Sequence, residues 1–251
     1  MSTLLQNIKA QHEGTEGLAV NNTFIRRIYT LVALKTTAHF FKPIGTCIPI
    51  SKHLIVKVGP SVHLAEASTM IYVAENTSIP VPKVFCSFLH KDRAYIVMER
   101  IQGQAITTVW EDLSETSREK IFGQLRRFIQ ELRTLKPTDG AIVASCIGGS
   151  VREPRIPRAL PRMGPFKNIQ EFHLFLRDNF RPKESKGKRE GEDWQQLVEM
   201  VTKQDGPWPE TVFSHGDLNP FNILVCGDEV AAIIDWEGAG WFPNYWEYTT
   251  A

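Results

Sequence analysis

The chain has 251 residues, of which 42% are hydrophobic and 23% charged, with a formal net charge of +1. This length can bury a sizeable core in one large or two small domains, and the near-zero charge argues against a nucleic-acid binder. Four scattered cysteines without a C-x-x-C spacing indicate neither a zinc site nor a disulfide framework and favour a reducing compartment. Without a membrane-length apolar run or a signal-peptide pattern, we expect a cytoplasmic monomer that contacts no membrane.

The first predicted strands contain a lysine that stands out. Residues 1–22 are polar and weakly patterned, which indicates a loose arm, and residues 23–30 favour a short helix before the pattern turns to strands at residue 31. Apolar runs at residues 47–50 and 54–58 predict two strands. Lys57 lies inside the second run, where burying an ammonium without a partner is costly. Either this strand lies at a sheet edge with Lys57 in water, or a carboxylate compensates the charge.

A helix and a further strand follow. Residues 62–76 repeat apolar side chains at helical spacing, and Glu66 falls in the first turns of that helix. The prolines within residues 79–84 exclude a central strand, because proline has no amide donor, so we expect an extended connection there. Residues 94–101 then predict a clear strand.

The longest predicted helix covers residues 116–135 and carries one apolar stripe, with a capping box at residues 116–119. After it, residues 152–189 contain 11 Lys or Arg against 4 acidic residues. A solvated basic surface explains this excess, and the alternative is an acceptor region that tolerates anionic substrates.

The most informative stretch lies near the C-terminal end. The motif H-G-D-L-N-P-F-N begins at His215, and an apolar strand at residues 230–234 ends on Asp235, 18 residues after Asp217. If this strand pairs with residues 223–225 as a hairpin, Asp217, Asn222 and Asp235 lie at one end of it. Two carboxylates and an amide supply the oxygen ligands that suit Mg²⁺ with phosphates, and a carboxylate free of the metal can orient a hydroxyl for attack.

These motifs resemble those of a known kinase family. Residues 215–222 resemble the catalytic loop, H-G-D-x-x-x-x-N, of the aminoglycoside phosphotransferase-like and choline kinase-like family. I-D-W-E at residues 234–237 resembles its metal-binding motif, and residues 238–248 resemble its fungal branch. The resemblance covers residues 45–251 and implies an α+β, protein-kinase-like fold of two lobes. A small antiparallel sheet with one helix would occupy residues 23–101, and a mainly helical lobe residues 102–251.

The resemblance also implies roles for the residues of the two loops. Asp217 would accept or orient the proton of the substrate hydroxyl. His215 would brace the catalytic loop at residues 214–222 by hydrogen bonding rather than act as the base. Asn222 and Asp235 would bind Mg²⁺, with Asp235 in the metal loop at residues 234–237.

Nucleotide contacts are implied for the N-terminal half. The segments around Lys57 and Glu66 resemble the family patterns V-V-K-Y-G and E-A-x-x-M, in which the lysine holds the α- and β-phosphates of ATP and the glutamate holds the lysine. The strand at residues 94–101 would lead to a hinge, where the backbone of Glu99, Arg100 and Ile101 meets the adenine edge.

The implied function is ATP- and Mg²⁺-dependent phosphorylation of a hydroxyl on a small molecule. Two features depart from the family: Gly45 stands alone where a glycine-rich phosphate loop is expected, and the chain stops at Ala251, where relatives usually continue with further helices. The alternative is therefore a kinase-like binding module without turnover. A metal hydrolase built on His215, Asp217 and Asp235 is a third hypothesis, but it leaves the strand lysine unexplained.

Overall fold

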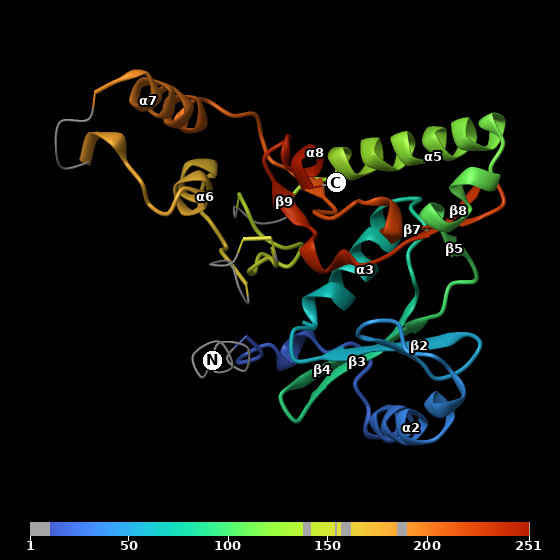
Figure 1. Ribbon diagram of the computed structural model, residues 1–251. Coiled ribbons are helices and arrows are strands. Elements are labelled where there is room, and N and C mark those ends of the chain that lie inside the picture. Colours follow the sequence, from blue (N-terminus) through green and yellow to red (C-terminus); the bar gives the residue numbers. More distant parts are fainter. Residues whose placement is uncertain (1–10, 138–141, 154, 157–161, 185–189, 251) are drawn as a thin grey trace.

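Two lobes of different size stack on each other in the computed structural model (Figure 1). The structure describes residues 11–137, 142–153, 155–156, 162–184 and 190–250. The small lobe is built on one antiparallel sheet of four strands in the order β1-β2-β4-β3. Its strands are β1 (Cys47–Pro49), β2 (Leu54–Gly59), β3 (Val84–His90) and β4 (Arg93–Glu99).

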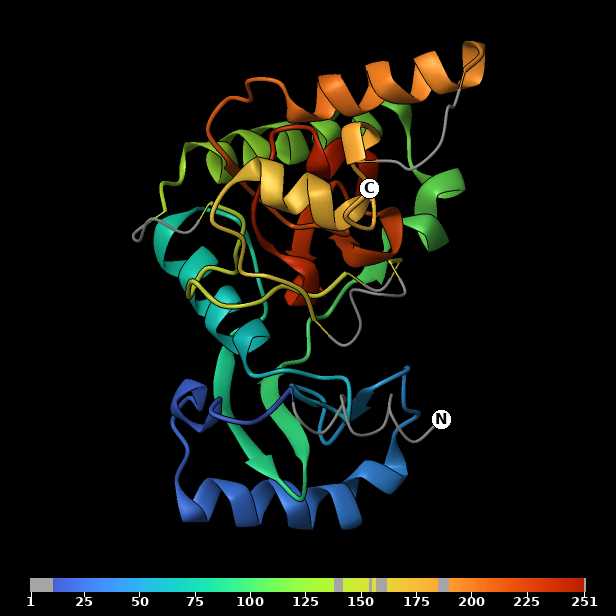
Figure 2. The same ribbon diagram turned by 90° about the vertical axis from the view of Figure 1, so that its left-hand side faces the viewer.

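The two faces of this sheet bury different helices, because side chains alternate along each strand. Val56 packs on the face that α2 (Phe24–Lys35) covers. Ile55 packs on the opposite face, in the core that contains α3 (Ala65–Asn76). Lys57 shares the face of Ile55, so the pleat of β2 directs it toward α3 and the large lobe. Figure 2 shows α2 beyond the sheet, on the side away from the large lobe.

The N-terminal part is more ordered than its sequence pattern indicates. Helix α2 continues to Lys35, five residues beyond the expected helix, and the 3₁₀ turn η2 (Thr37–Phe40) follows it where strands were expected. Residues 11–22 of the expected arm pack on the small lobe: the Ser87 amide donates to the carbonyl of Val20 at 2.8 Å. The first ten residues lie outside the described residues.

The large lobe combines five described helices with short strands. The helices are α4 (Ile106–Val109), α5 (Glu115–Thr134), α6 (Ile169–Leu176), α7 (Glu192–Asp205) and α8 (Trp246–Thr250). Strands β5 (Gln104–Ala105), β7 (Ile223–Cys226) and β8 (Glu229–Ile233) form one sheet, and β6 (Val212–Ser214) pairs with β9 (Gly240–Phe242). In the described part of the chain, no helix has both the length and the apolar composition to cross a bilayer.

Helix α5 is capped two residues before the expected capping box. Its N-cap is Ser114, whose hydroxyl accepts from the Ser117 amide at 3.1 Å, so the box predicted at residues 116–119 is wrong. The apolar stripe of this helix is buried at Ile121, Phe128 and Leu132.

The expected hairpin forms and places the two loops together. Strands β7 and β8 pair antiparallel with Ile223 opposite Ile233. The Ile234 amide donates to the Asn222 carbonyl at 2.9 Å, which ties the end of β8 to the end of the catalytic loop. One apolar cluster joins this hairpin to α3 and β4 across both lobes, through residues that include Met70 and Trp236.

Candidate functional site

Lys57 is the centre of a buried cluster of charges. Its ammonium lies 2.8 Å from Glu66 Oε1, 2.6 Å from Asp235 Oδ1 and 3.5 Å from Glu237 Oε2. Strand β2 is paired on both sides, with β1 and β4, and Lys57 is only 5% exposed. The alternative of an edge strand with its lysine in water is therefore wrong, and carboxylates compensate the buried charge.

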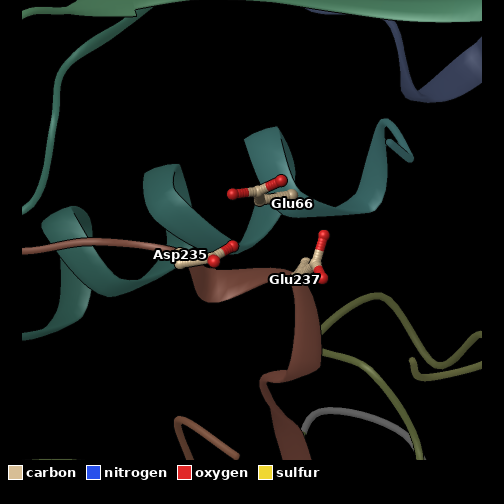
Figure 3. A group of neighbouring side chains, drawn as sticks. All are labelled: Glu66, Asp235 and Glu237. Carbon is tan, nitrogen blue, oxygen red and sulfur yellow. The ribbon is translucent and has the colours of Figure 1, made fainter. Parts of the chain in front are cut away.

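The carboxylates around Lys57 come from two lobes. Glu66 projects from the first turn of α3, while Asp235 and Glu237 project from the loop after β8 (Figure 3). Asp235 adopts the left-handed conformation, with φ of 66°, at the start of the 3₁₀ turn η7 (Trp236–Gly238). One carboxylate oxygen from each of the three residues lies within 4.8 Å of the others.

Burial and neighbouring charges act in opposite directions on this cluster. Burial alone lowers the pKa of Lys57, but Glu66, Asp235 and Glu237 together outweigh it and raise the pKa, so the ammonium stays charged. Burial raises the pKa of Glu66 to about 7, with Lys57 opposing it. Glu237 is also compensated by Arg152, whose Nε lies 3.0 Å from its carboxylate.

Asp217 and Asn222 meet within the catalytic loop. The side-chain amide of Asn222 donates to Asp217 Oδ2 at 3.0 Å and to the Asp217 carbonyl at 2.8 Å. These bonds fix the amide orientation and leave Asn222 Oδ1 without a donor among the described residues. The loop thus holds the carboxylate of Asp217 half-buried, with one amide oxygen available beside it.

His215 braces the loop through both ring nitrogens. It is fully buried; Nε2 donates to the Ile234 carbonyl at 3.0 Å and Nδ1 accepts from the Asp217 amide at 3.2 Å. Burial lowers the pKa of His215, in keeping with the neutral ring that this pattern requires. With both nitrogens engaged by backbone, His215 offers no ligand atom to a metal, which removes the basis of the hydrolase hypothesis.

Gly216 lets the two loops touch. Its φ is 80°, and a Cβ at this position would lie 2.5 Å from the carbonyl oxygen of Gly238. Both the backbone conformation and the contact exclude a side chain. This close approach fixes the distance between the catalytic loop and η7.

Two residues that the motif analysis missed hold the catalytic loop from outside. The buried carboxylate of Glu247, on α8, accepts from the amides of His215 at 2.5 Å and Gly216 at 3.3 Å. Arg155 donates to the Gly216 carbonyl at 2.7 Å and pairs with buried Glu153. Residues 238–248 therefore support the catalytic loop as well as packing aromatic rings. The sequence feature that could have indicated this role is an acidic residue, Glu247, within a run of aromatic residues.

The basic stretch is only partly the solvated surface that we expected. Arg152 connects the two lobes: its NH1 donates to the Ser61 carbonyl of the small lobe at 2.7 Å, and its Nε pairs with Glu237. Burial lowers the pKa of Arg162 to about 10, with Arg152 adding to the effect. Arg181, in contrast, is half-exposed and pairs with Glu184 at 3.7 Å. No anionic acceptor is needed to explain Arg152, because carboxylate and carbonyl groups of the chain already bind it.

The expected hinge residues lie at the end of β4, and they differ in whether their backbone amides are already hydrogen-bonded. The amides of Glu99 and Arg100 already donate to the carbonyls of Lys83 and His53, at 2.9 and 2.8 Å. Ile101 has no backbone hydrogen bond within the described residues. Of the three, Ile101 therefore has the backbone groups best able to meet a ligand.

The position of the missing glycine-rich loop is occupied by a tight turn. Ile44 and Cys47 exchange two backbone hydrogen bonds of 2.9 Å, and Gly45 between them has φ of 57°. In the described residues no strand precedes β1, and α2 with η2 takes up the preceding chain.

Comparisons with known proteins identify a family and a fold for this chain. The sequence model of the "Phosphotransferase enzyme family" matches residues 52–250. The chain matches no curated protein sequence. Among solved structures, a thermostable mutant of aminoglycoside phosphotransferase APH(4)-Ia superposes with a TM-score of 0.52 and 16% identity, covering 80% of this chain and 65% of that chain. APH(3'')-Id from Streptomyces rimosus, in complex with ADP and streptomycin, superposes with a TM-score of 0.52 and 14% identity. This match covers 91% of this chain and 82% of that chain.

The structural likeness at such low identity shows the fold alone, which is the protein-kinase-like fold of two lobes. The chain spans 65% of the length of APH(4)-Ia, so the activity of the whole relative does not transfer by itself. The family model covers most of the chain, from β2 to α8. The chain belongs to the phosphotransferase enzyme family.

Proposed function

We propose that this protein transfers a phosphoryl group from ATP, in the presence of Mg²⁺, to a hydroxyl of a small molecule. The observation that carries the proposal is the position of Lys57, whose ammonium joins Glu66 of α3 to Asp235 of the metal loop. A charged lysine between a helix carboxylate and a metal-loop carboxylate suits the binding of nucleotide phosphates. The relatives support the nucleotide: the APH(3'')-Id structure holds ADP and streptomycin, and one APH(4)-Ia structure holds ADP and hygromycin B.

The donor set fits a magnesium ion. Asn222 Oδ1 has no donor among the described residues, and the second carboxylate oxygen of Asp235 is free of the Lys57 hydrogen bond. Oxygen ligands of this kind, few in number, are what Mg²⁺ takes from a protein when phosphates supply the rest. When bound, the ion neutralises charge on the phosphates.

The residues of the site then position the reacting groups, and one of them also accepts a proton. Lys57 binds the phosphates, and Glu66 keeps its ammonium aimed into the cleft. Asp217 accepts the proton of the acceptor hydroxyl, with its carboxylate oriented by Asn222. Ile101 offers its backbone to the adenine edge. Because phosphoryl transfer depends on positioning and charge stabilisation, these contacts account for most of the catalysis we expect.

Two measurements test the proposal. In a thermal shift assay, Mg·ATP should raise the melting temperature of the wild type, and Asp235→Ala should abolish the shift. In an ATP-consumption assay with pooled small hydroxyl compounds, the wild type should turn over and Asp217→Ala should lose at least about a hundredfold in rate while remaining folded. A thermal shift without consumption of ATP against any pool would instead indicate the binding module without turnover. Absence of any shift would reject nucleotide binding.

A further inference from the structure

Helix α2 presents an apolar face to solvent. Its inner face packs Leu31 and Leu34 on the sheet. The outer face exposes Phe24, Ile25, Ile28, Tyr29 and Val32, at 76, 63, 43, 73 and 51%. At roughly 100° per residue these five positions fall within an arc of about 140°. The helix is thus apolar on both faces, and only one of them has a partner among the described residues.

This exposure is concentrated in one segment. Of the 14 large hydrophobic residues that are exposed in the described part of the chain, seven lie between Phe24 and Ile44, with Phe40 and Ile44 following the helix. The long helix α5 and helix α7 each expose a single one, Phe122 and Met200. Scattered single residues are ordinary on a protein surface, whereas a contiguous face indicates an interaction surface.

The chain segment that carries this face contains charged residues of one sign. Residues 17–65 contain no Asp or Glu and six Lys or Arg. Lys35 falls within the same arc as the apolar positions and is exposed, as is Lys42 after it. Three acidic residues, Glu13, Glu16 and Asp92, line a hollow together with Arg27, which lies on the inner side of the helix.

The single sign of charge decides between possible occupants. A second copy would bring a face of the same positive sign, and residues 17–65 offer no acidic side chain to compensate it. An anionic bilayer instead offers an apolar boundary for aromatic and branched side chains and phosphate groups for lysines. Against the expectation of no membrane contact from the sequence, we propose that the outer face of α2 binds the surface of an anionic membrane, with the helix lying flat in the headgroup region.

The site remains accessible in that orientation. Helix α2 covers the face of the sheet that contains Val56, while Lys57 and the charge cluster lie on the opposite face. Figures 1 and 2 both place α2 at the end of the molecule away from the large lobe. A membrane at α2 would therefore recruit the protein without closing the cleft, and its binding can be measured without any catalytic activity.

The test is co-sedimentation of the full chain with vesicles of pure phosphatidylglycerol and, separately, of pure phosphatidylcholine. The wild type should bind phosphatidylglycerol and bind phosphatidylcholine about tenfold more weakly. Ile25→Ser combined with Tyr29→Ser should lower the partition coefficient on phosphatidylglycerol by about tenfold or more. Lys35→Glu should weaken binding to phosphatidylglycerol alone.

Met200→Ser is the matched control, because Met200 is an exposed apolar residue on α7, and it should bind like the wild type. Circular dichroism should show that each variant is folded. The proposal is overturned if the folded wild type stays in the supernatant with both vesicles, or if the α2 double variant binds as well as the control. Light scattering that shows a dimer dissolved by the double variant would assign the face to a second copy instead.

Discussion

The ammonium of Lys57 lies 2.6 Å from the carboxylate of Asp235, although 178 residues separate them in the sequence. This contact joins the small lobe directly to the metal loop. In the proposed function, Lys57 would hold the nucleotide phosphates and Asp235 would hold the metal ion. The contact between them therefore marks where binding and chemistry are expected to meet.

Replacing Lys57 should impair both stability and nucleotide binding. Lys57→Met leaves three carboxylates without the cation that they surround, and breaking such a buried pair costs about 3 kcal/mol. Chemical denaturation should report this loss, and the thermal shift with Mg·ATP should disappear. Lys52→Met, in the exposed turn before β2, is the matched control and should change neither quantity. A wild-type response of Lys57→Met to Mg·ATP would contradict the assigned role.

Arg152 should act on nucleotide affinity as a positioning residue. It connects the Ser61 carbonyl of the small lobe to Glu237 beside the metal loop. Arg152→Gln should raise KM for ATP by about tenfold, because one charge-assisted hydrogen bond is lost, and should change kcat less. Arg152→Lys should restore part of the loss. Arg181→Gln, which removes an exposed arginine, should behave as wild type, and an equal effect of both glutamine variants would refute the assignment.

Glu247 should control the stability of the catalytic loop. Its carboxylate accepts two backbone amides, and removing it leaves both buried donors unsatisfied at a cost of about 2 kcal/mol. We therefore expect Glu247→Ala to lower the free energy of unfolding, and Glu247→Gln, which keeps one acceptor, to lower it less. Glu210→Gln is the control, since Glu210 is exposed and, among the described residues, pairs only with Lys136. If the three variants unfold at the same denaturant concentration, the bracing role is wrong.

Stability should fall as the pH drops below about 6.5. Burial lowers the pKa of His12, His63, His173 and His215, and that of His63 to about 3. Below 6.5 the unfolded chain binds protons that the folded chain resists, so acid favours unfolding. Glu66 acts in the opposite direction, because its pKa is raised to about 7 and the folded chain binds one proton there more readily than the unfolded chain.

Urea denaturation between pH 7.5 and 5 measures this slope directly. His173→Gln should make the slope shallower by one proton, because His173 is buried and bonded to Tyr245 and to a backbone carbonyl. A free energy of unfolding that is flat over this range would contradict the account.

The positions of the loop residues could be predicted from the sequence, whereas the residues that hold the loops in place could not. Asp217, Asn222 and Asp235 could be placed together because they lie at the ends of two strands joined by a short turn, which fixes their distance locally. Glu247 and Arg152 could not be placed at the site from the sequence. Each lies in a segment outside the two loops, and no pattern in the sequence relates that segment to the loops. Their contacts exist only once tertiary packing has brought α8 and residues 142–153 against the loops.

Helix α2 illustrates a different limit. Its residues 28–32 include the β-branched Ile28, Thr30 and Val32, which favour strands by local propensity. Burial of Leu31 and Leu34 against the sheet overrides that preference, so the helix continues to Lys35. Local propensity is therefore a weak predictor of secondary structure where tertiary packing buries one apolar face of a segment.

Isothermal titration calorimetry with Mg·AMP-PNP tests the central claim most directly. The wild type should bind one equivalent, and Asp235→Asn should weaken binding by at least about tenfold, because the metal-loop carboxylate is lost. Glu210→Gln should titrate like the wild type. Binding of equal strength in the wild type and Asp235→Asn, or no binding by the folded wild type, would contradict a nucleotide site between Lys57 and Asp235.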